Sequence, residues 1–288
     1  MIIQPLRQRT HALPILLSCL AMATALPGLA RAAQDRPLWE AGIGVGAVSF
    51  PAYRGSDEHQ QYILPTPYFT FHGKFLKADR NGVRGQLFSS DRLDLTVSAA
   101  LSPPAPSKKI EARAGMPDLE ANFELGPELD LTLWRADGGQ RSLKLLVPLR
   151  VAHTLDRQLE NIGWVFHPKL NLDLGDLPGL RGWNVGLQAG PLFGDRRQHQ
   201  YFYGVDGAHA TATRPAYQAR GGFAGMQYLA AVSRRFDRYW VGAFLRYDNL
   251  RGAAFEDSPL VRTRHYWAGG FGISWILGES STRVTVDE

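Results

Sequence analysis

Residues 123–133, Phe-Glu-Leu-Gly-Pro-Glu-Leu-Asp-Leu-Thr-Leu, alternate between apolar and polar side chains. The odd positions carry phenylalanine, proline and leucine, whereas the even positions include Glu124, Glu128 and Asp130. Successive side chains of a β-strand point to opposite faces, so this period of two predicts a strand with one apolar and one charged face.

The same alternation recurs in five further segments, at residues 93–101, 143–151, 164–173, 239–247 and 266–275. These segments run to about 9 to 13 residues, whereas strands of soluble proteins average about 5 to 6. No stretch after residue 33 has the uninterrupted apolar run that a membrane helix needs. The lengths therefore favour strands that cross a bilayer.

Aromatic residues lie near the ends of these segments, where the interfacial belts of membrane proteins are found. They are Trp134, Trp164, Trp183, Tyr239, Trp240, Tyr247, Tyr266, Trp267 and Trp275.

Short and long connections alternate along the chain. The short ones lie near residues 72–73, 89–92, 135–141, 175–182 and 236–237, and the long ones at 50–60, 102–118, 154–162, 194–222 and 249–265. Strict alternation needs one further turn, which Arg80-Asn81-Gly82 can supply. Short turns on one side and long loops on the other are typical of outer-membrane barrels. We therefore expect an all-β fold, a closed antiparallel transmembrane β-barrel of about 12 strands with both chain ends periplasmic; ten strands is the alternative count.

Three prolines, Pro127, Pro148 and Pro168, fall within the alternating segments. Each lacks a ladder donor, so we expect them at bulges or strand ends.

The first 32 residues resemble a signal peptide. Arg7 and Arg9 precede an apolar stretch, and Ala30-Arg31-Ala32 matches a small-x-small cleavage site. We predict a leader over residues 1–32 and one barrel domain over 33–288; a membrane anchor and lipidation at Cys19 are the alternatives. Cys19 is the only cysteine, so no disulfide framework is expected after cleavage. Removing the three leader arginines from the formal charge of +5 leaves +2, which gives no reason to expect nucleic-acid binding.

Charged side chains on the polar strand faces are expected to point inward, because a charge facing lipid costs about 2 to 4 kcal/mol at mid-depth. The candidates are Glu124, Glu128, Asp130, Lys144, Arg150, Lys169, Asp173 and Arg246. They can pair with one another and fill the interior, or they can line a narrow water-filled pore.

The longest loop, residues 194–222, is rich in aromatic residues, and loops of this length are usually functional. With the 50–60 loop it offers a candidate interaction surface of Tyr53, Tyr201, Tyr203, Arg214 and Tyr217. The alternative is that these side chains pack into the barrel mouth.

No catalytic, cofactor or metal site is expected. The candidates for a serine–histidine pair are His153, His167, His199, His209 and His265 with Ser56, Ser142 and Ser258. However, the sequence has no G-x-S-x-G elbow and no metal-ligand spacing.

In a set of short stretches the chain resembles the MipA/OmpV family of outer-membrane proteins. The stretches are Gly42–Gly46, Tyr53–Glu58, Leu64–Tyr68, Phe123–Gly126, Gly190–Asp195, Tyr201–Asp206, Arg214–Tyr217, Asp257–Val261 and Ser274–Leu277. The resemblance implies an outer-membrane scaffold whose partners are a murein lytic transglycosylase and a bifunctional murein synthase, with no catalytic residues to carry over. A porin-like channel for small solutes is the alternative, followed by a hydrolase that acts on lipid at the barrel rim. One departure is the tail Val284–Glu288, because many outer-membrane barrels end on an aromatic residue.

Overall fold

The computed structural model describes residues 34–72, 76–79, 82–136 and 140–286, and the predicted leader lies outside them. Thirteen strands form one antiparallel sheet: β2 (Trp39–Pro51), β3 (His59–His72), β4 (Leu76–Asp79), β5 (Gly82–Ser89), β6 (Leu93–Ser102), β7 (Asn122–Ala136), β8 (Arg141–Thr154), β9 (Asn161–Phe166), β10 (Lys169–Leu177), β11 (Leu180–Gly194), β12 (Gly222–Arg235), β13 (Tyr239–Asn249) and β14 (His265–Glu279). A two-stranded ribbon joins β1 (Gln34–Pro37) to β15 (Arg283–Val286). Among the described residues, the helices are α1 (Arg196–Tyr203) and the short 3-10 turns η1 (Ser107–Lys109), η2 (Glu111–Arg113) and η4 (Gly207–His209).

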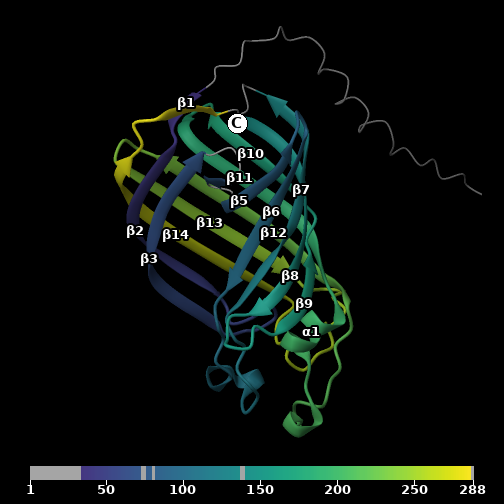
Figure 1. The fold of residues 1–288 in the computed structure, drawn as a ribbon. Helices are drawn as coiled ribbons and strands as arrows, with labels where there is room; N and C mark the ends of the chain where they lie inside the picture. The colour runs from purple at the N-terminus through teal and green to yellow at the C-terminus, as the bar shows by residue number, and fades with distance from the viewer. Residues whose placement is uncertain (1–33, 73–75, 80–81, 137–139, 287–288) are drawn as a thin grey trace, which may run out of the picture. The chain divides into compact units, whose positions relative to one another are not determined.

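The strand pairings run in a cycle (Figure 1). Consecutive strands pair from β2 to β9 and from β10 to β14, β14 pairs with β2, and β10 pairs with both β8 and β11. Strands β9 and β10 are two parts of one strand that is interrupted at His167 and Pro168, since β9 also pairs with β8 and β11. Counted in this way, the sheet has the twelve antiparallel strands that the sequence predicts.

The alternation of side chains places polar groups on the inside of this ring. On β7, Leu125, Leu129 and Leu133 are 49%, 38% and 45% exposed, whereas Glu128 and Asp130 are only 6% and 3% exposed. This polarity is the reverse of a soluble sheet, whose apolar face is the buried one.

The long loops gather at one end of the strands, and the ribbon β1–β15 lies at the other end (Figure 1). Asp79 of β4 is paired with Gly82 of β5, so the chain reverses between them as expected. Gly73, Arg80 and Asn81, which belong to the predicted turns, lie outside the described residues. In the described part of the chain, no helix is both long and apolar enough to span a bilayer.

The three prolines differ in their effect. Pro168 lies between β9 and β10, which agrees with the expected strand end. Pro127 and Pro148 lie inside β7 and β8, where the pairing passes from Leu125–Val151 to Glu128–Pro148 without a change of register. The expected bulge is therefore wrong for these two prolines. Instead, the β7–β8 ladder lacks pairs at Gly126 and Pro127, and both strands continue beyond them in the same register.

The ribbon β1–β15 was not predicted. The tail after β14 continues into four residues that pair with the segment before β2, from Pro37–Arg283 to Gln34–Val286. A strand of four residues is too short for its alternation to be distinguished from chance.

Candidate functional site

Arg150 connects three strands through the interior of the ring. Its guanidinium lies 3.1 Å from Glu128 and 3.8 Å from Glu124, both on β7, and its Nε donates to the Ser98 hydroxyl of β6 at 2.9 Å. The Glu128 carboxylate is almost fully buried, so its charge must be balanced locally. Three of the eight predicted inward charges, Arg150, Glu124 and Glu128, thus belong to one cluster.

Asp248 is the centre of a second cluster, near the long-loop end. It is fully buried, and its carboxylate lies 2.8 Å from Arg246 and 3.1 Å from Arg54. Gln227 of β12 donates to the same carboxylate at 3.2 Å. Because Arg54 comes from the 50–60 loop, this cluster ties a loop to the strand wall. The Arg54 Nε also lies 3.3 Å from the Tyr266 hydroxyl oxygen.

Arg246 was predicted from the sequence, whereas Arg54 and Asp248 were not. The signal for Asp248 was present, because the alternation of β13 places it on the same face as Arg246 two residues earlier. No local pattern indicates Arg54, since it lies in a loop and meets Asp248 across 194 positions of sequence.

A third cluster lies at the opposite, short-turn end and was also missed. Glu40 of β2 is 2.6 Å from the guanidinium of Arg235 on β12, and Tyr68 of β3 donates to Glu40 at 3.0 Å. Glu279 of β14 lies 3.7 Å from the same arginine. Clusters at both ends and in the middle therefore connect strands that are not neighbours in the sheet.

The remaining predicted charges also lie on the interior face. Asp173 accepts a hydrogen bond from Asn171 at 2.7 Å, and Asn171 in turn accepts one from Gln188 at 2.9 Å. Asp130 is buried on β7, and Lys144 is half-buried on β8 opposite Asn171.

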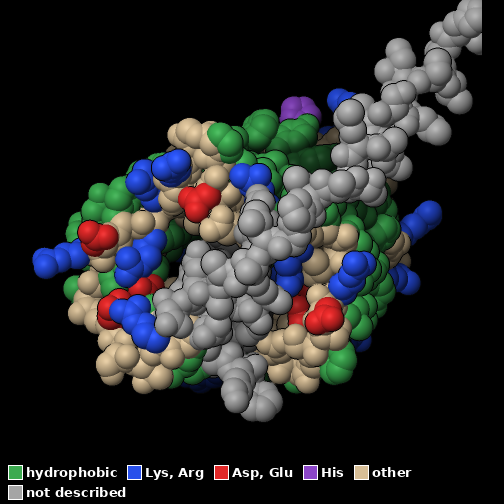
Figure 2. All heavy atoms as spheres, turned by 90° about the horizontal axis from the view of Figure 1, so that it is seen from above, with side chains coloured by type: hydrophobic (Ala, Val, Ile, Leu, Met, Phe, Trp, Pro, Cys, Tyr) green, Lys and Arg blue, Asp and Glu red, His purple; other side chains and the backbone are tan. Residues whose placement is uncertain are grey.

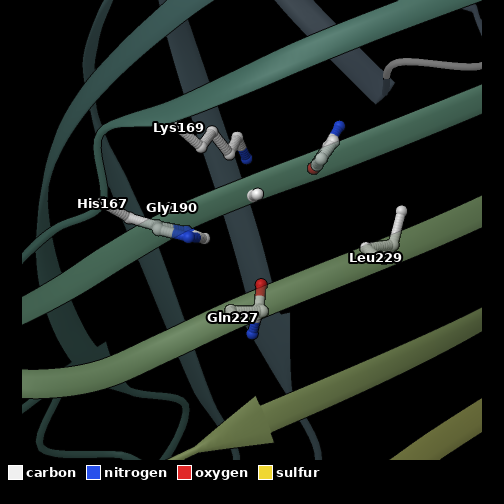
Figure 3. A pocket seen from close by; sticks show the side chains of 7 residues that line it. His167, Lys169, Gly190, Gln227 and Leu229 are labelled. Atoms are coloured by element: carbon white, nitrogen blue, oxygen red, sulfur yellow. The ribbon is translucent and has the colours of Figure 1, made fainter. Parts of the chain in front are cut away.

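Lys169 lies beside a recess in the wall of the interior (Figure 3). His167, Gln188 and Gln227 also line this recess, and the Lys169 side chain and the His167 ring point into the same space. Side chains fill this recess almost completely, whereas sites for organic ligands typically measure about 300 to 1,000 Å³. It is therefore too small for such a ligand.

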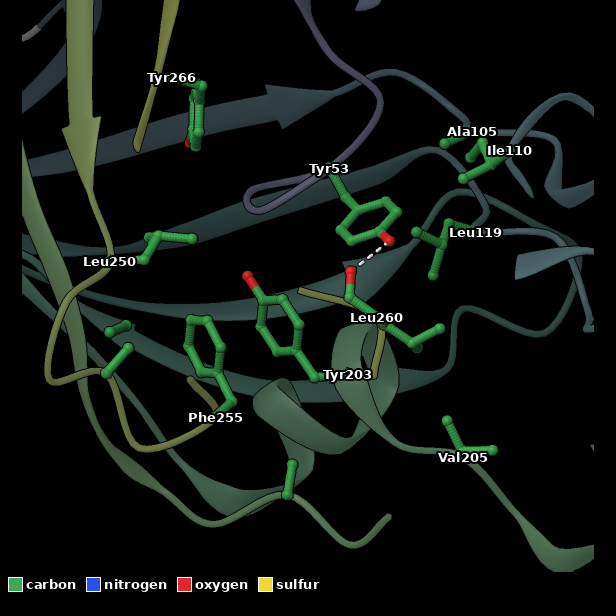
Figure 4. Packing of buried hydrophobic residues seen from close by; sticks show 13 residues of the cluster. Tyr53, Ala105, Ile110, Leu119, Tyr203, Val205, Leu250, Phe255, Leu260 and Tyr266 are labelled. Carbon is green, nitrogen blue, oxygen red and sulfur yellow. Dashed lines mark hydrogen bonds between the residues drawn. The ribbon is translucent and has the colours of Figure 1, made fainter. Parts of the chain in front are cut away.

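The long loops form a packed unit, which we call the loop cluster: residues 52–58, 103–121, 195–221 and 250–264 (Figure 4). At its centre the rings of Tyr203 and Phe255 stack with centroids 3.6 Å apart, and His199 meets Phe255 edge-on at 4.7 Å. The Tyr53 hydroxyl donates to the Leu260 carbonyl at 2.6 Å. All four segments contribute buried apolar side chains, so the loops have a hydrophobic core of their own.

Two arginines in the loop cluster, the buried Arg113 and the half-buried Arg214, bind backbone carbonyls. Arg113 donates to the carbonyls of Phe202 and Pro117 at 3.0 and 3.1 Å, and Arg214 donates to those of Ala112 and Ala114 at 3.1 and 2.9 Å. These bonds fasten the 103–121 segment to the 195–221 segment.

The predicted interaction surface is divided by this packing. Tyr53 and Tyr203 are only 5% and 3% exposed, so they belong to the core of the loop cluster and do not form an exposed surface. Burial raises the pKa of both phenols, which keeps their hydroxyls protonated as donors. Tyr201, Arg214 and Tyr217 are half-buried around that core.

The serine and histidine candidates are occupied by other partners. The Ser258 hydroxyl donates to the Tyr203 carbonyl at 2.8 Å, and the His199 Nδ1 lies 2.6 Å from the Arg220 carbonyl oxygen. His153 lies 3.4 Å from the Asn161 amide and stacks on Phe123. Within the described residues, none of the eight candidates forms a serine–histidine hydrogen bond. The described part of the chain also contains no group of three or more His, Cys, Asp or Glu side chains that could hold a metal ion.

Comparison with known proteins identifies a family. A sequence model described as MltA-interacting protein MipA matches residues 43–277. No curated protein matches the chain. Among solved structures, the chain is similar to a bacterial polysaccharide outer membrane secretin, with 8% identity and a TM-score of 0.44 over 83% of this chain and 99% of that one. It is also similar to the Pseudomonas putida toluene transporter TodX, with 11% identity and a TM-score of 0.24 over 83% of this chain and 67% of that one. Both TM-scores are too low to support an argument, whereas the family match extends from β2 to β14 and includes every long loop. The chain therefore belongs to the MipA family.

Proposed function

We propose that the twelve strands form a closed β-barrel that spans a bacterial outer membrane, with the short turns and both chain ends in the periplasm. The supporting observation is the reversed polarity of the ring. Ile63, Leu101 and Leu277 are 79%, 77% and 74% exposed, while Glu128 and Asp248 are buried. An outward apolar surface of this kind is stable in hydrocarbon, and closure satisfies the backbone groups that an open edge would leave unpaired. Separation of cell membranes on a density gradient tests this location, and recovery in the inner membrane would contradict it.

Within that membrane we propose that the barrel is a scaffold for murein-processing enzymes, a lytic transglycosylase first and a murein synthase second. The family description names an interaction with MltA, and the proposed orientation presents the short turns to the periplasm. Figure 2 views this end and shows basic and acidic side chains around its rim. Arg181 and Arg238 are exposed there, and neither forms an ion pair within the described residues. They offer cations to an acidic partner surface.

Capture of envelope proteins on the purified barrel tests the scaffold. The wild-type protein is expected to retain a lytic transglycosylase, and Arg181→Gln combined with Arg238→Gln to retain less. Arg196→Gln combined with Arg197→Gln, at the other end of the strands, is the matched control. Recovery of no transglycosylase on the wild-type barrel would refute the scaffold.

A channel for small solutes is the second candidate, because charges of both signs line the interior. The Arg150–Glu128 pair and the packed loop cluster both restrict a water path, so we expect no stable unit conductance in planar bilayers. A steady conductance that changes in Arg150→Gln or Glu128→Gln would favour the channel over the scaffold.

A further inference from the structure

An aromatic band crosses the outer face of the ring just below the loop cluster. Phe166 of β9 is paired with Leu149 of β8 and with Phe193 of β11, and Phe193 is paired with Phe223 of β12. Residues paired in register share one face of a sheet. Leu149 is 47% exposed on the outer face, so the three phenylalanines lie on that face too. Trp164, 40% exposed, continues the band towards the loops.

Two exposed arginines lie directly beyond this band. Arg196 and Arg197 form the first turn of α1 and follow Phe193 by three and four residues. Helix α1 abuts β9 closely, because a Cβ atom on Gly163 would lie 2.2 Å from Asp195 and 2.6 Å from the Gln198 nitrogen. The arginines are therefore held at the level where the aromatic band ends.

Neutral groups orient both guanidinium groups. Arg197 donates to the Asn161 side chain at 3.2 Å, and Arg196 donates to the Gln218 side chain at 3.0 Å. Neither arginine forms an ion pair within the described residues. Asp195 carries the carboxylate next to them in the chain. It caps the N-terminus of α1, where its Oδ1 accepts a hydrogen bond from the backbone N–H of Gln198 at 2.8 Å.

Two more exposed arginines flank this position. Arg220 precedes Gly221, at which a Cβ atom would lie 2.7 Å from the Arg196 nitrogen. Arg251 precedes Gly252, at which a Cβ atom would lie 3.9 Å from the Phe223 ring. The chain at Arg220 thus approaches Arg196, and the chain at Arg251 approaches the Phe223 ring. Each of the four arginines has hydrogen-bond donors to offer.

We infer that Arg196 and Arg197, flanked by Arg220 and Arg251, bind the phosphate groups of a phosphorylated glycolipid in the outer leaflet. The inference rests on the proposed outer-membrane location with the long loops outside. Guanidinium groups match phosphate oxygens in a bidentate manner, and the acyl chains of the same lipid would lie along the aromatic band. The same arginines could bind free phosphate, so the experiment has to separate the two sources.

Native mass spectrometry of the full-length protein in detergent micelles tests the site with three probes: bisphosphorylated lipid A, the same lipid after removal of both phosphates, and inorganic phosphate. We expect the wild type to bind bisphosphorylated lipid A, and Arg196→Gln combined with Arg197→Gln to bind it about tenfold more weakly or worse. The double lysine variant Arg196→Lys/Arg197→Lys keeps the charge and should retain most of the binding. Arg181→Gln/Arg238→Gln, at the opposite end, should bind like the wild type.

Equal binding of dephosphorylated lipid A, or wild-type binding by the double glutamine variant, would overturn the inference. Inorganic phosphate bound with the same arginine dependence, while lipid A is not bound, would also overturn it in favour of a free-anion site. Heat-modifiable migration on gels verifies that each variant is folded. The assay contains no enzyme, so it can succeed when transglycosylase capture fails, and the two failures are distinguishable.

Discussion

Replacing Asp248 by asparagine removes the one carboxylate that Arg54 and Arg246 share. The two guanidinium groups lie 3.1 and 2.8 Å from it, and the aspartate is fully buried. Removing one member of a buried ion pair costs about 3 to 5 kcal/mol, because the partner is left buried and uncompensated. Here the arginine side chains are 22% and 29% exposed, so water can solvate them in part. The substituted amide also keeps an oxygen acceptor. We therefore expect a loss of about 2 kcal/mol in the free energy of unfolding.

Urea unfolding of the protein in detergent micelles, followed by tryptophan fluorescence, measures this loss. Asp237→Asn is the matched control, because Asp237 is exposed and its carboxylate has no partner within the described residues. A second measurement is local. Arg54 anchors the 50–60 loop, so Asp248→Asn should speed trypsin cleavage after Arg54, and Asp237→Asn should not.

A double-mutant cycle isolates the cause. If the cost comes from stranded arginines, Arg54→Gln should be less harmful in the Asp248→Asn background than in the wild type. Additive effects of the two substitutions, or an unfolding midpoint of Asp248→Asn equal to that of Asp237→Asn, would refute the reasoning.

Three further predictions concern the loop cluster and the leader. Phe255→Ala should lower the free energy of unfolding by about 3 kcal/mol, because it leaves a cavity beside Tyr203. Faster proteolysis of the loops, with unchanged heat-modifiable migration on gels, would localise the effect to the loop cluster. Burial lowers the pKa of His199 below its ordinary value of about 6.5. Because the unfolded form therefore binds the proton first, protection of the loops from proteolysis should be complete above about pH 6.5 and decrease as the pH falls. In a protease assay, His199→Gln should flatten that pH dependence. N-terminal sequencing of the exported protein should begin at Ala33, and a start at Met1 would contradict the predicted cleavage after Ala32.

The strands were predictable because their evidence is local. The alternation at 123–133 identifies β7 from eleven consecutive residues, and it also distinguishes Glu128 and Asp130 from the leucines between them. The number of strands required one more step. A turn at Arg80-Asn81-Gly82 was needed to keep short and long connections in alternation, and β4 and β5 are indeed separate strands.

The loop cluster was not predictable because its contacts are not local. Tyr53 meets the Leu260 carbonyl across 207 positions, and Tyr203 meets the Arg54 carbonyl across 149. An aromatic residue in a loop has the same local sequence whether it is exposed or packed. Its alternative roles, binding surface or core, could therefore be stated from the sequence but not decided.

The burial of Tyr53 and Tyr203 changes what the sequence motifs of this family resemblance mean. Tyr53–Glu58 and Tyr201–Asp206 contribute core residues to the loop cluster, so their aromatic side chains are explained by packing without a partner. A surface for periplasmic enzymes would then be sought at the other end of the strands, where the connections are short and carry exposed arginines such as Arg181 and Arg238. The two ends would accordingly serve different molecules. The long-loop end would meet membrane lipid through Arg196 and Arg197, and the interior clusters between them would hold the wall rigid.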